Sequence, residues 1–116
     1  MALQAYKELS GKATVNNGAA TAAVIAAPGA GKTIRLVGGI LNVTAAATGG
    51  GGVVELRDGS TAIISVDGNA LGSYPFYYDG MNGFPLTANT ALNLVTASAV
   101  TTQATANVSV VAYQVG

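Results

Sequence analysis

The stretch "KTIRLVGGILNVTA" (residues 32–45) combines β-branched residues with an alternation of apolar and polar positions. In an extended chain Ile34 and Leu36 face one side and Arg35 faces the other, as in a half-buried strand. The pair Gly38-Gly39 interrupts the run and suits a β-bulge, or a bend where the strand passes from one sheet to the other. This stretch therefore predicts one long β-strand.

The residues just before it, "AAPGAGKT" (26–33), match the pattern of a phosphate-binding loop. Such a loop needs a helix after it, because the helix N-terminus offers N–H groups and a positive dipole end to the phosphates. Here the following residues are β-branched and broken by paired glycines, which disfavours a helix. We interpret the stretch as a turn that ends a strand near Val24 and starts the long strand, with Lys32 facing solvent or a neighbouring subunit.

Elsewhere the β-formers come in short runs separated by Gly, Asn and Asp. Hairpin or tight-turn signals lie at 47–53, 57–61 and 66–70, which fits consecutive antiparallel strands. The chain is thus expected to be all-β, a single antiparallel β-sandwich with jelly-roll-like character. The predicted strands span residues 21–26, 32–45, 52–58, 61–66, 72–78, 91–97 and 107–115.

The first 20 residues differ from the rest of the chain. Leu3, Tyr6 and Leu9 are spaced for one face of a short helix, and "SGK" and "NNGA" then break it. We predict that residues 1–20 form an N-terminal extended arm that contacts a neighbouring chain. Residues 21–116 are then the β-sandwich domain.

Charge and composition exclude several classes of function. Five basic and five acidic residues cancel, and only 9% of the chain is charged, against about 25% in an average protein. The chain therefore lacks the field that attracts nucleic acid or an anionic membrane. Cysteine and histidine are absent, which removes thiol chemistry, most zinc sites and the commonest general base.

The positions of the acidic residues and the hydropathy of the chain exclude further classes of function. Asp58, Asp67 and Asp79 each precede Gly, where an Asx-type turn is the ordinary explanation. No export signal and no apolar run of membrane-spanning length stands out. We expect no catalytic residues and no enzymatic activity, no cofactor or metal, and neither a nucleic acid nor a membrane as partner.

Aromatic residues cluster in one segment: five of the seven Phe and Tyr residues fall between positions 74 and 84. Alternation would put Tyr74, Phe76 and Tyr78 on one side of a strand and Tyr77 on the other. The cluster fits a corner of the core with ordinary exposed tyrosines, a protein interface, or a glycan site where rings stack on sugars. With the arm included, the candidate interface residues are Leu3, Tyr6, Leu9, Tyr74, Phe76, Tyr77, Tyr78, Met81 and Phe84.

The order of segments over the 85 residues from Lys32 to Gly116 resembles a family of small β-sandwich proteins from the structural modules of tailed bacteriophages. The resemblance is carried by "GKTIRLVGGILNV", "GVVELRDGSTAI", a Tyr-Pro segment, "TANTALNLVTASA" and the final "VVAYQV". It has no catalytic residues to transfer. The N-terminal arm departs from the commoner pattern.

This resemblance implies a virion structural protein, made in the host cytoplasm and placed on the capsid exterior as a head decoration or cement subunit. Its implied partners are the major capsid protein, over whose joints it would bind, and further copies of itself, as a homotrimer or else a dimer. Related sandwiches also occur in head and tail fibres. A receptor- or glycan-binding module of a fibre, using Tyr74, Tyr77 and Tyr78, is therefore the alternative.

Overall fold

The computed structural model describes residues 6–16, 21–78, 83–98 and 101–116. Within these ranges all regular structure is β, and no helix is long and apolar enough to cross a membrane. The strands are β1 (Tyr6–Val15), β2 (Thr21–Ile25), β3 (Thr33–Ala45), β4 (Val53–Asp58), β5 (Thr61–Asp67), β6 (Gly72–Tyr77), β7 (Phe84–Pro85), β8 (Leu92–Ala97) and β9 (Thr105–Val115).

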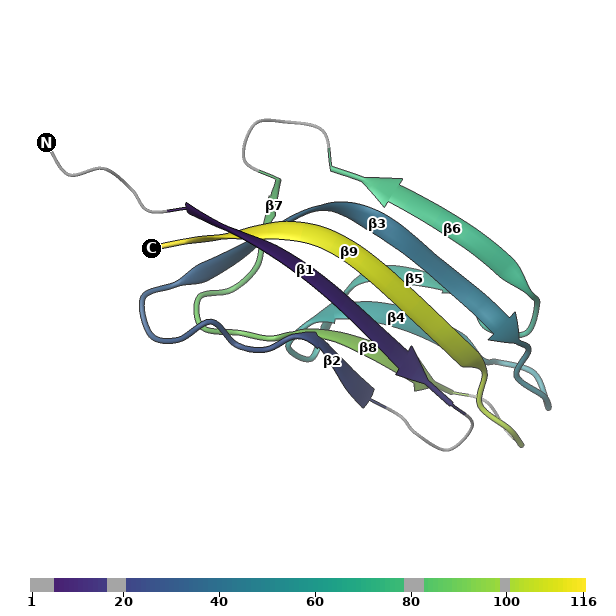
Figure 1. The fold of residues 1–116 in the computed structure, drawn as a ribbon. Helices are drawn as coiled ribbons and strands as arrows, with labels where there is room; N and C mark the ends of the chain where they lie inside the picture. The colour runs from purple at the N-terminus through teal and green to yellow at the C-terminus, as the bar shows by residue number, and fades with distance from the viewer. Residues whose placement is uncertain (1–5, 17–20, 79–82, 99–100) are drawn as a thin grey trace, which may run out of the picture.

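The strands form two antiparallel sheets that pack face to face, so the predicted all-β sandwich is confirmed. Sheet A has the order β1-β9-β3-β6, with the short β7 also paired to β3, and lies in front in Figure 1. Sheet B, behind it, has the order β2-β8-β4-β5. Most connections cross from one sheet to the other, as in a double-sheet jelly roll.

The hairpin predicted at 57–61 is present and joins β4 to β5. Its two-residue turn has a positive φ at Gly59 alone, as expected of a type II′ turn with Gly in the first central position. The hairpin predicted at 47–53 is wrong, because β3 lies in sheet A and β4 in sheet B. The turn at 66–70 likewise leads from one sheet to the other. Glycine gives a loop freedom to turn but does not decide whether the next strand pairs or crosses over.

The bulge predicted at the paired glycines is confirmed. The register of β3 against β9 shifts between Leu36 and Gly38, and β3 nevertheless stays in sheet A along its whole length. Gly39 is required by close packing, because a Cβ there would lie 2.1 Å from the carbonyl oxygen of Ser109. The expectation that the strand changes sheets at this point is therefore wrong.

The core lies between the two sheets and is aliphatic. Its largest members, all fully buried, come from both layers: Ile34, Leu36 and Leu41 from sheet A, and Leu56, Leu92 and Leu94 from sheet B. Burying a side chain of this size stabilises the fold by about 1.5–3 kcal/mol. The alternation read from residues 32–45 is thus what places Ile34 and Leu36 in the core.

The short helix predicted around Leu3, Tyr6 and Leu9 is wrong over the residues that the structure describes. Tyr6–Val15 is a ten-residue strand that pairs with β9 along its whole length. Alternation explains the difference: Val15 is fully buried and Leu9 packs on the core, while Glu8 faces solvent. This part of the predicted arm therefore belongs to the sandwich, and residues 1–5 and 17–20 lie outside the described residues.

Candidate protein-binding surface

The stretch that imitates a phosphate loop is a turn between β2 and β3. The N–H of Lys32 donates to the carbonyl of Gly29 at 3.1 Å, and Gly31 has a φ of +76°. In a phosphate loop, backbone N–H groups face the anion, but here the N–H of Gly29 donates to Oδ1 of Asn89 at 2.9 Å. A strand, β3, follows at Thr33. The interpretation as a turn that starts the long strand is confirmed.

Asp58 and Asp67 accept hydrogen bonds that stabilise turns and loops. Oδ1 of Asp67 accepts from the N–H of Asn69 at 2.8 Å, which is the predicted Asx-type turn. Oδ2 of Asp58 instead accepts from the N–H and the hydroxyl of Thr87, at 3.0 and 2.8 Å, and so ties the β4–β5 turn to the loop before β8. Asp79 lies outside the described residues. Among those that are described, no group of three His, Cys, Asp or Glu side chains is placed to hold a metal ion.

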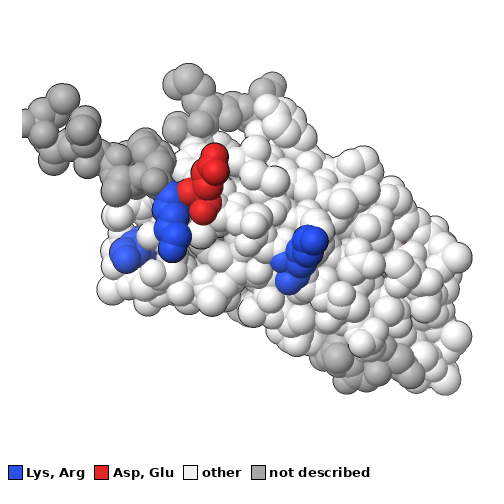
Figure 2. Space-filling model, viewed as in Figure 1, with Lys and Arg blue, Asp and Glu red and all other residues white. Residues whose placement is uncertain are grey.

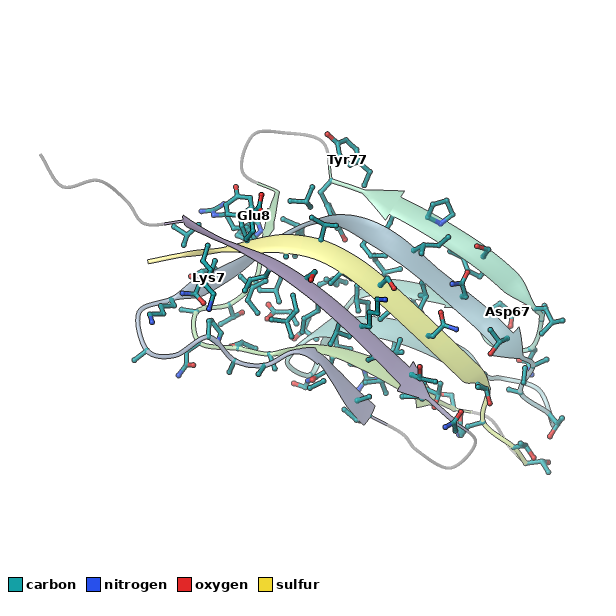
Figure 3. The ribbon with its side chains drawn as sticks, in the orientation of Figure 1. Lys7, Glu8, Asp67 and Tyr77 are labelled. Atoms are coloured by element: carbon teal, nitrogen blue, oxygen red, sulfur yellow. The ribbon has the colours of Figure 1, made fainter. Side chains whose placement is uncertain are left out.

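The aromatic cluster is divided by the alternation of β6, as predicted. Tyr74, Phe76 and Tyr78 are half-buried against the core, and the rings of Tyr78 and Phe84 have centroids 5.0 Å apart. Burial raises the pKa of the Tyr78 hydroxyl. Tyr77 lies on the opposite side of the strand and is 72% exposed. Figure 3 shows its side chain extending away from the sandwich at the end of β6.

The remaining candidate residues do not join this cluster. Leu9 packs against the core from β1, and Tyr6 lies at the start of the same strand. Leu3 and Met81 lie outside the described residues. The structure therefore brings together Tyr74, Phe76, Tyr78 and Phe84 and separates Tyr77 from them, while an interface role for the whole set stays a prediction.

The outer face of sheet A is where Tyr77 lies, and its outward residues are ordered by cross-strand pairing. Each row takes one residue from each of four strands, and paired residues share a face of the sheet. Beyond a charged end row of Glu8, Tyr113, Arg35 and Pro85 next to β7, the first, second and third rows are Ser10, Val111, Gly38 and Tyr77; Lys12, Ser109, Ile40 and Pro75; and Thr14, Asn107, Asn42 and Ser73.

The first two rows leave apolar side chains in solvent. Val111 is 59% exposed and Ile40 37% exposed. One atom of the Tyr77 ring lies 3.6 Å from the point where a Cβ of Gly38 would stand, so the ring contacts the space that this glycine leaves open on β3. We call Ile40, Pro75, Tyr77 and Val111 the outer patch. Contiguous apolar surface on a sheet that is otherwise polar is typical of an interaction site.

Polar groups flank the outer patch on both sides. In the third row Ser73 donates to Asn42 at 2.8 Å, and Asn42 donates to Asn107 at 3.0 Å, which forms a hydrogen-bonded chain across three strands. At the opposite end of the face lies the end row with Glu8 and Arg35, and charged side chains gather there, over the start of β1 (Figures 2 and 3). An apolar centre with a polar rim is the usual anatomy of a protein interface.

On the outer face of sheet B, the outward residue Val95 is covered by its neighbours. Glu55 and Arg57 form an ion pair on its outer face, with Nε of Arg57 donating to Oε1 of Glu55 at 2.9 Å. Val95, the cross-strand neighbour of Glu55, is only 5% exposed and is not part of the central core. Val95 of sheet B is therefore covered, whereas Val111 of sheet A is not.

The sequence reasoning did not find Val111 or Ile40. A signal was present, because Val110 and Val111 are adjacent in an alternating strand and only one of them can face the core. Val110 is buried and Val111 exposed. No family model, curated protein or solved structure matches this chain. Its function therefore has to be inferred from its own residues.

Proposed function

We propose that this chain is a bacteriophage virion structural protein, a decoration or cement subunit that binds the major capsid protein on the capsid exterior and stabilises the shell. The outer patch is the observation that carries the proposal. Exposed apolar surface on a sheet suits permanent docking on another protein surface, and such burial contributes about 25 cal/mol for each Å² removed from water.

Two further observations support the same proposal. The strand order of the two sheets is that of a jelly roll, an architecture that viral capsid domains share with lectins and cupins; this is an analogy of fold and carries no function by itself. The net charge is zero, so the chain lacks the self-repulsion that keeps proteins apart. Many copies, each binding weakly, would strengthen a shell through multivalency.

The direct test uses undecorated heads assembled from the major capsid protein of the same genome. Purified chain is mixed with these heads, the heads are pelleted, and their disruption temperature is measured with and without the chain. We expect saturable co-sedimentation and a higher disruption temperature. A chain that stays in the supernatant and leaves the disruption temperature unchanged would refute the proposal.

A glycan-binding module of a phage fibre is the second candidate, and the exposed ring of Tyr77 favours it, because tyrosine rings stack on sugars. Tyr74 and Tyr78 do not add to that surface, since both are half-buried against the core. This candidate predicts sugar binding that Tyr77→Ala abolishes, with no binding to heads. A glycan array probed with the chain and the Tyr77→Ala variant distinguishes the two candidates.

A further inference from the structure

The two sheets together have four edge strands, and three of these edges are protected in the described residues. The edge strands β1 and β2 pack closely against each other, since a Cβ on Gly11 would stand 2.4 Å from the carbonyl oxygen of Val24. The edge of β6 carries Pro75 near its middle, which has no N–H to donate to an added strand. These are common devices against edge-to-edge association.

The fourth edge, β5, lacks such protection along most of its length. Thr61–Asp67 contains no Pro and no Lys, and within the described residues no strand pairs with its outer side. A bulge at Ile63 disturbs only the half nearer the hairpin. The regular half, Ile64–Asp67, therefore presents backbone N–H and C=O groups that another strand can pair with.

The sandwich is also open next to this edge. On the opposite side β1 and β2 touch, but β5 and β6 have almost no contact with each other. Apolar side chains from both strands are therefore only half-buried, and Leu71, in the connection between the two strands, is 67% exposed. We call this set the open edge; its members are Ile63, Ile64, Val66, Leu71, Tyr74 and Phe76.

We propose that β5 pairs with β5 of a second copy of this chain, antiparallel about a two-fold axis at Ser65. An axis perpendicular to the sheet keeps core-facing residues opposite core-facing residues, so Ile64 lies opposite Val66 of the partner subunit. Sheet B then continues across both copies, and the open edges are covered against each other. A dimer is the second of the two oligomeric states that the family resemblance implies, after the favoured homotrimer.

The open edge is complementary to itself, since apolar residues meet apolar residues in this register, and the charge of β5 does not oppose a second copy as the occupant. Asp67 is the one charged residue of β5, and in the antiparallel pair its two copies lie four residues apart along the strands, about 14 Å. That separation exceeds the screening length of about 8 Å at physiological ionic strength. The strand therefore meets its own copy without like charges in contact, and Ser65, which is exposed, faces only another serine.

The first experiment uses the absence of cysteine from the chain. Ser65→Cys introduces a single thiol at the proposed axis, and mild oxidation is expected to give a disulfide-linked dimer. Ser10→Cys, exposed on β1 of the other sheet, is the matched control and is expected to stay uncrosslinked. Equal crosslinking of the two variants, or none at Ser65→Cys, would overturn the proposal.

The second experiment places charge on the axis. The wild-type chain is expected to show by light scattering twice its mass of 11.4 kDa. Ser65→Lys and Ser65→Glu each put like charges face to face and are expected to weaken association about tenfold or more, while an equimolar mixture of the two restores the dimer. Ser65→Thr keeps it, and circular dichroism checks that every variant is folded.

A monomeric or trimeric wild-type chain, or lysine and glutamate variants that stay dimeric alone, would each exclude this pairing. A foreign strand as occupant would give a wild-type monomer and is excluded by the expected result. These outcomes are separate from the proposed capsid role. The outer patch lies on the outer face of sheet A, so binding to heads can succeed or fail independently of the β5 contact.

Discussion

The side chain of Asn89 holds the backbone of Gly29, although the two residues are 60 positions apart in the chain. Its Oδ1 accepts from the N–H of Gly29 at 2.9 Å, and its own N–H donates to the carbonyl of Lys32 at 2.7 Å. Asn89 has a φ of 50°, a left-handed conformation that Asn tolerates better than most residues. This pair of contacts ties the loop before β8 to the turn that starts β3.

Two substitutions of Asn89 distinguish the contribution of its side-chain hydrogen bond to stability from the contribution of its backbone conformation. Asn89→Ala loses the side-chain acceptor and puts a residue less tolerant than Asn in the left-handed region, so we expect the free energy of unfolding to fall by about 1–3 kcal/mol. Asn89→Gly loses the acceptor but tolerates the φ, and should fall by less. Urea unfolding followed by circular dichroism measures both. Equal losses would show that the φ of Asn89 carries no cost.

Gly39 gives a prediction about packing within sheet A. A Cβ there would lie 2.1 Å from the carbonyl oxygen of Ser109 and 3.0 Å from the ring of Phe76. We expect Gly39→Ala to lower the free energy of unfolding by about 1–3 kcal/mol, because backbone atoms must shift to admit the methyl group. Ile40→Ala, at the next and outward position, is the control and should cost less. A stable Gly39→Ala variant would contradict the close approach of β3 and β9.

Tyr78 gives a prediction about alkaline pH. Burial raises its pKa in the folded protein above the ordinary value, which is about 10. The unfolded chain therefore loses this proton first, and the contribution of Tyr78 to stability, complete below pH 10, is lost as the pH rises through the folded pKa. We expect stability to fall less steeply above pH 10 in Tyr78→Phe. Identical pH profiles for the variant and the wild type would contradict a buried hydroxyl.

Much of the fold follows from local alternation. The seven predicted strands are all present within a few residues, because each has a polar and an apolar side that the pleat must separate. Sheet membership could not be predicted in the same way, since the loop at 47–53 is compatible with either a hairpin or a crossover. The strand at Tyr6–Val15 was missed because Leu3, Tyr6 and Leu9 also fit a helical spacing.

The candidate site was only partly accessible from the sequence. The sides on which Tyr74 and Tyr77 lie followed from alternation. The outer patch did not, because it joins Ile40, Tyr77 and Val111 through cross-strand pairing between positions far apart in the chain. The register of β3 against β9 depends on the bulge at Gly38, and a shift of one residue would move every side chain to the other face.

Binding of the Val111→Asp variant to undecorated heads tests whether the outer patch is the surface that binds the capsid. Asp at this 59% exposed position puts a charge in the outer patch without touching the core. Ala23→Asp, an equally charged change at an exposed position on the outer face of sheet B, is the control. We expect Val111→Asp to bind heads about tenfold or more weakly, while Ala23→Asp binds like the wild type and Val111→Asp remains as resistant to urea. Wild-type affinity in Val111→Asp would contradict binding of the capsid through the outer patch.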